Sequence, residues 1–179
     1  MQISFDGDRF EPLDTKELHG LNEGRHRAPL YVRLRDRHTG TEFIVLVCHL
    51  ARGDARLRVR QAAGLREWAR EQPVGIVSVG DYNMDFSFKT QKGNDALPEM
   101  LRDNIWLWVQ PAEWIDTQWS HNDNTGKDRN PNSMLDFAFV SGPAKDWNPW
   151  CQVIVRDGDF PDTNQTSDHR PVELRLELR

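Results

Sequence analysis

The chain has 179 residues, with 28 acidic and 23 basic side chains and a formal net charge of −5. Its length fits one domain, residues 1–179, with enough chain to bury a core. No segment has the apolar length of a membrane span, the first ten residues lack the order of a signal peptide, and two cysteines do not suggest a disulfide framework. These features leave the location open and favour a cytoplasmic protein. The acidic balance argues against a protein that only coats nucleic acid, but carboxylates that hold a metal ion give the same balance.

The first fifty residues predict one hairpin. Residues 1–30 are polar and show no clear period, so we expect them to be irregular. Residues 30–50, LYVRLRDRHTGTEFIVLVCHL, predict two strands around the turn RHTG. The nearly continuous apolar run Phe43–Leu50 is typical of a strand that is covered on both faces.

A helix and another buried strand follow the hairpin. Asp54 is a candidate N-cap for a helix that continues to about Glu71. Pro73 ends this helix, and VGIVSVGD predicts a buried strand that ends at Asp81. The helix carries several arginines that could contact phosphates, although a solvated helix face is the simpler interpretation: Arg56, Arg58, Arg60, Arg66 and Arg70.

The second half of the chain adds one helix and three strands. Apolar spacing predicts a helix over residues 95–109, and residues 120–133 form a long polar loop. Strands are predicted at 134–141, 152–156 and 172–178. Because strands and helices interleave, the expected fold class is α/β or α+β.

Polar side chains that can take part in catalysis or metal binding lie at or near the ends of four predicted strands. The segments are VCHL, VGDYNMD, SMLDFAFV and TSDHRPV, and their candidate residues are His49, Asp81, Asn83, Asp136, Asp168 and His169. The ends of strands can hold such groups in a fixed geometry.

Each candidate has a chemical use. Asp81 and Asn83 are two residues apart and would face one side of an extended strand, where a carboxylate and an amide can hold a hard cation and a phosphate oxygen. Asp136 could hydrogen-bond one nitrogen of His169 and fix its tautomer. Asp168 could bind a metal or position an attacking water.

Simpler interpretations exist for each residue alone. An Asp-x-Asn pair often forms a turn, the residues before His169 could be turn residues, and a lone histidine such as His49 is often part of the core. Asp136 is the exception, because a carboxylate among apolar strand residues needs a partner.

Together, the four segments resemble motifs of the endonuclease/exonuclease/phosphatase superfamily, which has the DNase I-like fold. VCHL is similar to the Thr-His-Leu strand end of that family, GDYN to Gly-Asp-Phe-Asn, LDFAFVS to Leu-Asp-Tyr-Ile-Phe-Val-Ser, and SDHRPV to its last motif. The motifs occur in the family order from about Arg27 to the end of the chain. The resemblance implies a layered β-sandwich flanked by helices.

The resemblance also implies residue roles. His169 would be the base or proton-transfer histidine, paired with Asp136, and Asp81 would position the nucleophilic water or help to hold the metal. Asn83 would contact the scissile phosphate and the metal, Asp168 would be a metal-side carboxylate, and His49 would contact the substrate and stabilise charge on its phosphate. Mg²⁺ is the implied ion, and Mn²⁺ or Ca²⁺ could replace it.

One part of the family pattern is missing. Family members begin with a strand that carries an Asn, followed by a unit that ends in Gln-Glu, whose Glu binds the metal. Residues 1–30 contain no matching strand, and the chain has no Gln-Glu dipeptide. The chain therefore resembles the C-terminal portion of such a domain, and a missing segment or a partner chain could complete the fold.

The expected function is a metal-dependent phosphodiester hydrolase in which His and Asp assist attack by water, most simply a nuclease that acts on DNA or RNA. A phosphomonoesterase and a sphingomyelinase-like phospholipid phosphodiesterase are alternatives, because the motifs address only the phosphate. A non-catalytic remnant or binding module is a further alternative, since the metal Glu and the Asn are missing. Six tryptophans could stack on bases or simply pack in the core: Trp106, Trp108, Trp114, Trp119, Trp147 and Trp150.

Overall fold

A computed structural model describes residues 1–22, 27–119, 133–157, 159 and 167–178. Its main element is a six-stranded mixed sheet with the strand order β1-β2-β3-β4-β6-β5. The strands in that order are β1 (Phe10–Glu17), β2 (Leu30–Asp36), β3 (Glu42–His49), β4 (Gly75–Phe86), β6 (Met134–Ser141) and β5 (Trp106–Trp108). A second sheet consists of two antiparallel strands, β7 (Trp150–Val153) and β8 (Val172–Arg175).

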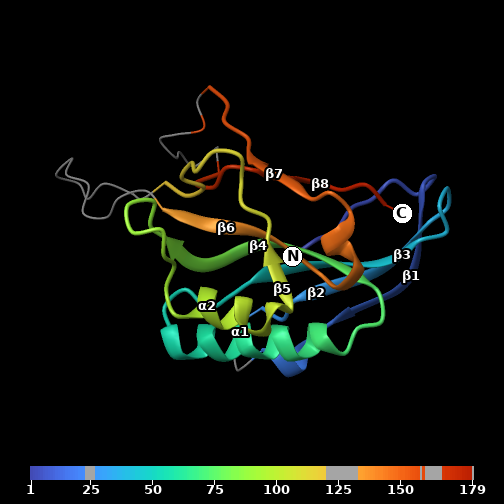
Figure 1. Cartoon of the computed structure of the whole chain (residues 1–179), viewed down its shortest axis with the longest axis horizontal. Coiled ribbons are helices and arrows are strands. Elements are labelled where there is room, and N and C mark those ends of the chain that lie inside the picture. The colour runs from blue at the N-terminus through green and yellow to red at the C-terminus, as the bar shows by residue number, and fades with distance from the viewer. Residues whose placement is uncertain (23–26, 120–132, 158, 160–166, 179) are drawn as a thin grey trace.

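Helices cover one face of the six-stranded sheet and the β7–β8 pair covers the other (Figure 1). The helices are α1 (Ala55–Arg70) and α2 (Ala96–Leu101), with short 3-10 turns η1 (His19–Leu21), η2 (Arg102–Asn104) and η3 (Gly142–Asp146). Two hydrophobic clusters result: one joins the sheet to α1 and α2, and the other lies between the sheet and the residues of β7 and β8. The expected layered β-sandwich flanked by helices is confirmed. Within the described ranges, no helix is both long and apolar enough to cross a membrane.

The β3-α1-β4 unit fixes the edge where the candidate residues gather. Asp54 caps α1, since its carboxylate accepts a hydrogen bond from the Leu57 N–H at 2.8 Å, as the sequence predicted. The helix carries the chain back along the sheet, so β3 and β4 are parallel and their C-terminal ends lie at the same edge. β6 is antiparallel to β4 and therefore begins at that edge.

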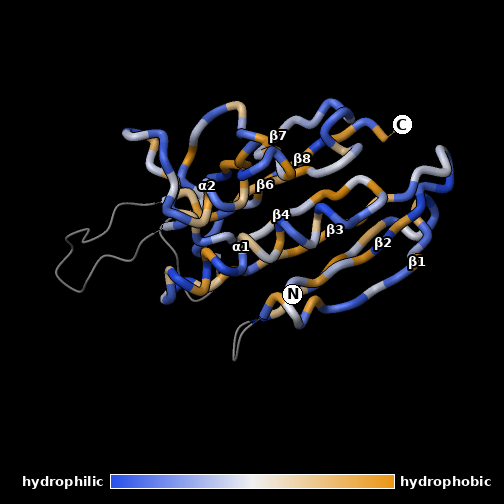
Figure 2. Tube along the Cα trace, turned by 60° about the horizontal axis from the view of Figure 1, so that its bottom comes forward, coloured by the Kyte–Doolittle hydropathy of each residue, from blue (hydrophilic) through white to orange (hydrophobic). Residues whose placement is uncertain are grey.

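The expectation of an irregular N-terminal segment was wrong. Residues Phe10–Glu17 form β1, which pairs antiparallel with β2 at the edge of the sheet. Most of its side chains are exposed, and the strand is largely hydrophilic along its length (Figure 2). Pro12, next to a shift in register, is tolerated because an edge strand needs fewer N–H donors. An edge strand of this kind lacks the apolar alternation that identifies a strand from sequence.

The predicted helix over 95–109 was only partly right. Helix α2 ends at Leu101, where the chain turns through Asp103 and Asn104 with positive φ of 60° and 54°. Trp106–Trp108 then forms β5, which pairs with the C-terminal end of β6. The strands predicted at 152–156 and 172–178 also differ, because β7 starts earlier, at Trp150, and β8 ends at Arg175.

The arginines of α1 do not form one solvated face. Arg58 and Arg66 are buried, and Arg66 pairs with Glu99 at 2.5 Å. Arg70 pairs with Asp103 at 2.8 Å, whereas Arg56 is exposed. Three of the six tryptophans that could have stacked on bases are buried, Trp106, Trp108 and Trp147, whereas Trp150 is exposed.

Candidate active site

Three predicted residues lie side by side across three neighbouring strands. In the register of the sheet, His49 of β3 is opposite Asp81 of β4, and Asp81 is opposite Asp136 of β6. Directly opposite residues project from the same face of a sheet. Gly80 allows this close approach, because a Cβ atom at that position, with φ of 141°, would lie 2.0 Å from the carbonyl oxygen of Cys48. The sheet register alone therefore builds a polar row.

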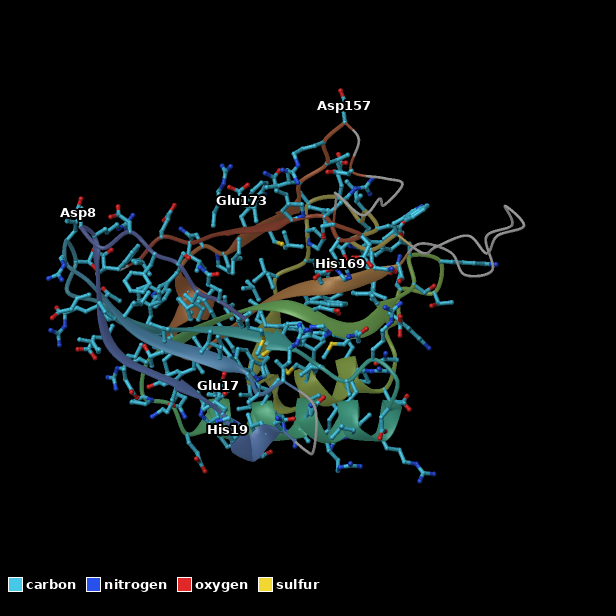
Figure 3. The ribbon with its side chains drawn as sticks, turned by 180° about the vertical axis from the view of Figure 1, so that it is seen from behind. Asp8, Glu17, His19, Asp157, His169 and Glu173 are labelled. Carbon is cyan, nitrogen blue, oxygen red and sulfur yellow. The ribbon has the colours of Figure 1, made fainter. Side chains whose placement is uncertain are left out.

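His169 completes the row from the segment before β8. Its Nδ1 lies 2.7 Å from Oδ2 of Asp136, and it is seen beside β6 in Figure 3. An ionised carboxylate can only accept, so Nδ1 donates and Nε2 is the nitrogen left to exchange a proton. The hydrogen bond that His169 donates to Asp136 raises the pKa of His169 above its ordinary value, against the effect of burial, and the charges of Asp136, Asp81 and Asp168 act in the same direction.

Asp81 and Asp136 form a pair of adjacent carboxylates in a half-closed site. Each side chain is 16% exposed. Burial, and then the charge of Asp136, raise the pKa of Asp81, although the Asn83 N–H donates to its Oδ1 at 2.9 Å. Two carboxylates held this way disfavour each other's charge, and a cation would relieve that repulsion.

His49 lies between Asp81 and a cation that the sequence motifs did not indicate. Its Nε2 is 3.6 Å from Oδ2 of Asp81, and its Nδ1 is 3.2 Å from a guanidinium nitrogen of Arg27. Arginine can only donate, so Nδ1 accepts and the hydrogen of His49 is carried on Nε2. This N–H is directed toward the row of carboxylates. The His49 side chain is 40% exposed and is the most accessible of the four.

Asn83 does not sit as an extended strand would place it. Its φ is 51°, and the register of β4 with β6 breaks between Asp81 and Phe86. The residue is 2% exposed, and its side-chain amide donates to the carbonyl of Leu50 at 3.0 Å. Asn83 thereby ties β4 to the loop that follows His49. Contacts of Asn83 with a phosphate or a metal stay a prediction.

Asp168 is half-buried next to His169, and its backbone carbonyl accepts from Trp119 N–H at 2.9 Å. Its carboxylate is near enough for its charge to raise the pKa of His169. The predicted role of Asp168 at a metal also stays a prediction.

One segment that the motif analysis missed joins both sides of the site. Residues Thr117–Trp119, which we call the bridging segment, hydrogen-bond to Ser133 before β6 and to the backbone on either side of His169. Arg170 strengthens this link, donating from its guanidinium to the carbonyl of Asp116 at 3.0 Å. Arg170 belongs to the SDHRPV motif, but nothing in the sequence around residue 117 indicates that the bridging segment supports the site.

The chain is similar to known proteins in structure. No family model matches the sequence, and no curated protein matches it in sequence. The structure matches a mannosyl-6-phosphatase of Bacteroides thetaiotaomicron with a TM-score of 0.67 at 16% identity, over 96% of this chain and 68% of that one. It also matches an endonuclease/exonuclease/phosphatase family protein from the same organism with a TM-score of 0.68 at 17% identity, over 95% of this chain and 64% of that one.

The fold is that of the endonuclease/exonuclease/phosphatase superfamily. A third DNase I-like match is the beta toxin of Staphylococcus aureus with bound magnesium ions, with a TM-score of 0.60 at 16% identity over 83% of this chain and 57% of that one. The chain thus spans 68%, 64% and 57% of these three proteins.

The donor atoms of the site suit a hard cation. In the described parts of the chain, no three or more His, Cys, Asp or Glu side chains are grouped as a metal site. Mg²⁺, however, often takes one or two protein carboxylates and completes its shell with waters and substrate phosphates. The Asp81 carboxylate fits that partial arrangement, because the neighbouring charge of Asp136 raises the pKa of Asp81 and a cation would relieve this repulsion.

Proposed function

We propose that this DNase I-like chain is a metal-dependent phosphoesterase that hydrolyses phosphodiester bonds of DNA or RNA. The observation that carries the proposal is the 2.7 Å contact between His169 Nδ1 and Asp136, in line with Asp81 and His49. A histidine oriented by a carboxylate is a proton-transfer device, and a phosphate ester is a substrate on which such a device and adjacent metal-binding carboxylates act together.

The residues would divide the work as follows. His169 transfers a proton at Nε2, while Asp136 holds the ring and stabilises its charged form. Asp81 accepts a hydrogen bond from the attacking water. His49 donates from Nε2 to a phosphate oxygen, and Asn83 supports the phosphate. Electrostatic stabilisation of the developing charge is commonly the largest contribution in such sites.

Mg²⁺, with Mn²⁺ or Ca²⁺ as substitutes, is the proposed cofactor. Asp81, Asn83 and Asp168 are the residues proposed to hold it, and when bound it supplies positive charge that neutralises phosphate oxygens. The magnesium-bound beta toxin, which shares the fold, supports this choice.

Nucleic acid is the favoured substrate because exposed arginines follow the strand that carries His49. Arg52 lies three residues after His49, and Arg56 lies in the first turn of α1. Both side chains are exposed, where they could neutralise phosphates that flank the scissile one. A phosphomonoesterase is the second candidate, favoured by the likeness to the mannosyl-6-phosphatase.

A nicking assay tests the proposal. Supercoiled plasmid and single-stranded oligonucleotides are incubated with the protein in Mg²⁺ and then with EDTA. We expect cleavage that stops with EDTA and with His169→Ala. His38→Ala is the matched control, because His38 is exposed in the turn between β2 and β3, at the far end of β3 from His49. Cleavage that persists in His169→Ala would refute the site assignment.

A second comparison separates the two candidate functions. Bis(p-nitrophenyl) phosphate is a diester and p-nitrophenyl phosphate a monoester, and both release the same chromophore. Preference for the diester supports the nuclease proposal, and preference for the monoester supports the phosphomonoesterase. If neither is hydrolysed and nucleic acids stay intact, a non-catalytic binding module becomes the better account.

We also propose that β8 receives a further strand, from a preceding segment or a partner chain. Among the described residues, β8 pairs with β7 alone. A two-stranded sheet is only marginally stable by itself, and an open strand edge invites pairing. Size-exclusion chromatography with light scattering tests for a partner copy: a dimer or larger species supports one, and a monomer at high concentration argues against it.

A further inference from the structure

Thr117 is a fully buried polar residue next to the Asp136–His169 pair. Its exposed fraction is 0%, and it belongs to the bridging segment Thr117–Trp119. No sequence motif marks Thr117, and the proposed function does not use it. Its hydrogen bonds nevertheless reach Asp136 on one side and Arg170, the residue after His169, on the other.

The Thr117 side chain holds the start of β6. Its Oγ1 accepts a hydrogen bond from Leu135 N at 2.9 Å and another from Asp136 N at 3.0 Å. One hydroxyl oxygen therefore receives two successive backbone N–H groups, which uses both of its lone pairs. Leu135 is itself buried, so solvent does not readily replace this acceptor.

The Thr117 backbone holds the other side of the pair. Its carbonyl accepts from Arg170 N at 2.8 Å, one residue beyond His169, and Trp119 N donates to Asp168 O at 2.9 Å, one residue before it. Gln118 lies directly opposite His169 in this short antiparallel bridge. The histidine backbone is thereby fixed between two hydrogen bonds to the bridging segment.

We propose that Thr117 is a positioning residue that sets the contact between Asp136 and His169. It joins the backbone of Asp136 to the backbone of Arg170, next to His169, through one residue. In the described chain, β6 and β8 are not paired with each other, so the strands do not supply that link. The inference rests on the proposed function for its catalytic meaning, but the geometry it explains can be measured without turnover.

Two variants separate positioning from packing. Thr117→Val keeps the shape of the side chain and removes the acceptor, and Thr117→Ser keeps the acceptor. Ser141→Ala is the matched control, because Ser141 is a buried residue at the far end of β6 whose hydroxyl donates to Ile105 O at 2.7 Å. It removes a buried side-chain hydrogen bond from the same strand, away from the pair.

The readout is the low-field proton resonance of His169 Nδ1–H in metal-free protein, assigned by its loss in His169→Ala. We expect the resonance in wild type, Thr117→Ser and Ser141→Ala, and its loss or marked displacement in Thr117→Val. A resonance in Thr117→Val that matches wild type would overturn the proposal. This outcome is independent of whether any phosphate ester is hydrolysed.

Hydrogen exchange and steady-state kinetics test the same proposal independently of the NMR resonance. In wild type, the amides of Leu135 and Asp136 should resist hydrogen exchange as well as those of Phe137 and Ala138 in the sheet; rapid exchange of the first two would overturn the proposal even if Thr117→Val does not fold. Where the wild type hydrolyses a phosphate ester, Thr117→Val should lower kcat by about 100-fold with KM nearly unchanged, because a small displacement of a reacting group is costly. An unchanged kcat would contradict it.

Discussion

Each of the two histidines in the site has one ring nitrogen already engaged. His169 uses Nδ1 to reach Asp136 at 2.7 Å, and His49 uses Nδ1 to accept from Arg27 at 3.2 Å. Both rings are therefore oriented so that Nε2 is the nitrogen left for a substrate. The two rings differ in their neighbours, a carboxylate for one and a guanidinium for the other, which suits one to transfer protons and the other to donate a hydrogen bond.

Replacing Asp136 by asparagine tests the orientation of His169. Asp136→Asn keeps the size of the side chain but removes the charge that favours the protonated ring and can present an N–H to Nδ1. We expect kcat for a phosphodiester to fall by at least about 100-fold, in the range that general acid–base groups contribute. Steady-state kinetics on bis(p-nitrophenyl) phosphate measure this. A kcat equal to wild type would remove Asp136 from the proposed mechanism.

At the scale of residues, the sequence indicated the reactive side chains of the site better than the residues that hold them in place. Asp136 could be predicted because a carboxylate within LDFAF needs a partner, and His169 was the partner expected. Arg27 and Thr117 could not be predicted, because their roles come from contacts across the fold: Arg27 lies 22 residues from His49, and Thr117 lies 19 residues from Asp136. No local pattern marks such contacts.

At the scale of elements, the β3-α1-β4 unit is the one that local signals specify best. The apolar run of β3, the Asp54 cap and the second apolar run were all readable and all formed. β1 was missed because an exposed edge strand has little apolar alternation, and β5 because Ile105 and Trp108 also fit a helical period. Both segments form strands because they pair with a neighbouring strand of the sheet, β1 with β2 and β5 with β6.

The two helix caps give a matched pair of stability predictions. Asp54 caps α1 through its side chain, whereas Asp95 at the start of α2 makes no side-chain capping hydrogen bond. Asp54→Ala should lower the free energy of unfolding by about 1 kcal/mol. Asp95→Ala should change it by less than about 0.5 kcal/mol. Urea unfolding measures both, and equal effects of the two substitutions would contradict this account of α1.

The β1–β2 edge should give the protein part of its acid sensitivity. The Asp36 side chain is fully buried, and burial raises its pKa, but hydrogen bonds from His38 N–H and from Arg9 lower it more, so the pKa lies below its ordinary value of 3.8. A carboxyl whose folded-state pKa is depressed stabilises the fold above its unfolded pKa, and this contribution disappears as the pH falls through the folded pKa.

Asp36→Asn tests this link between charge and stability. We expect a lower melting temperature than wild type at pH 7, with a difference that shrinks as the pH is lowered to about 3. Thermal unfolding followed by circular dichroism over this range measures the effect. A difference that stays constant with pH would mean that Asp36 acts through shape alone.

At the scale of the whole molecule, the site lies where the layers of the fold meet. The six-stranded sheet supplies His49, Asp81 and Asp136, while His169 comes from the segment before β8 in the second sheet. The layered architecture and its resemblance to the DNase I-like fold could be predicted because the motifs mark strand ends in a fixed order. The extent of the second sheet could not, because the apolar alternation of residues 172–178 continues beyond Arg175, where β8 ends, and β7 starts before the predicted residue 152.

The central claim is that His49, Asp81, Asp136 and His169 act on one phosphate group. The most direct test follows the imidazole resonances of His49, His169 and His38 by NMR while a deoxynucleoside monophosphate and Mg²⁺ are added to the protein. The account predicts that the resonances of His49 and His169 shift together with a single dissociation constant, while that of His38 stays unchanged. If only one of the two site histidines responds, or if His38 shifts equally, the four residues do not form one phosphate site.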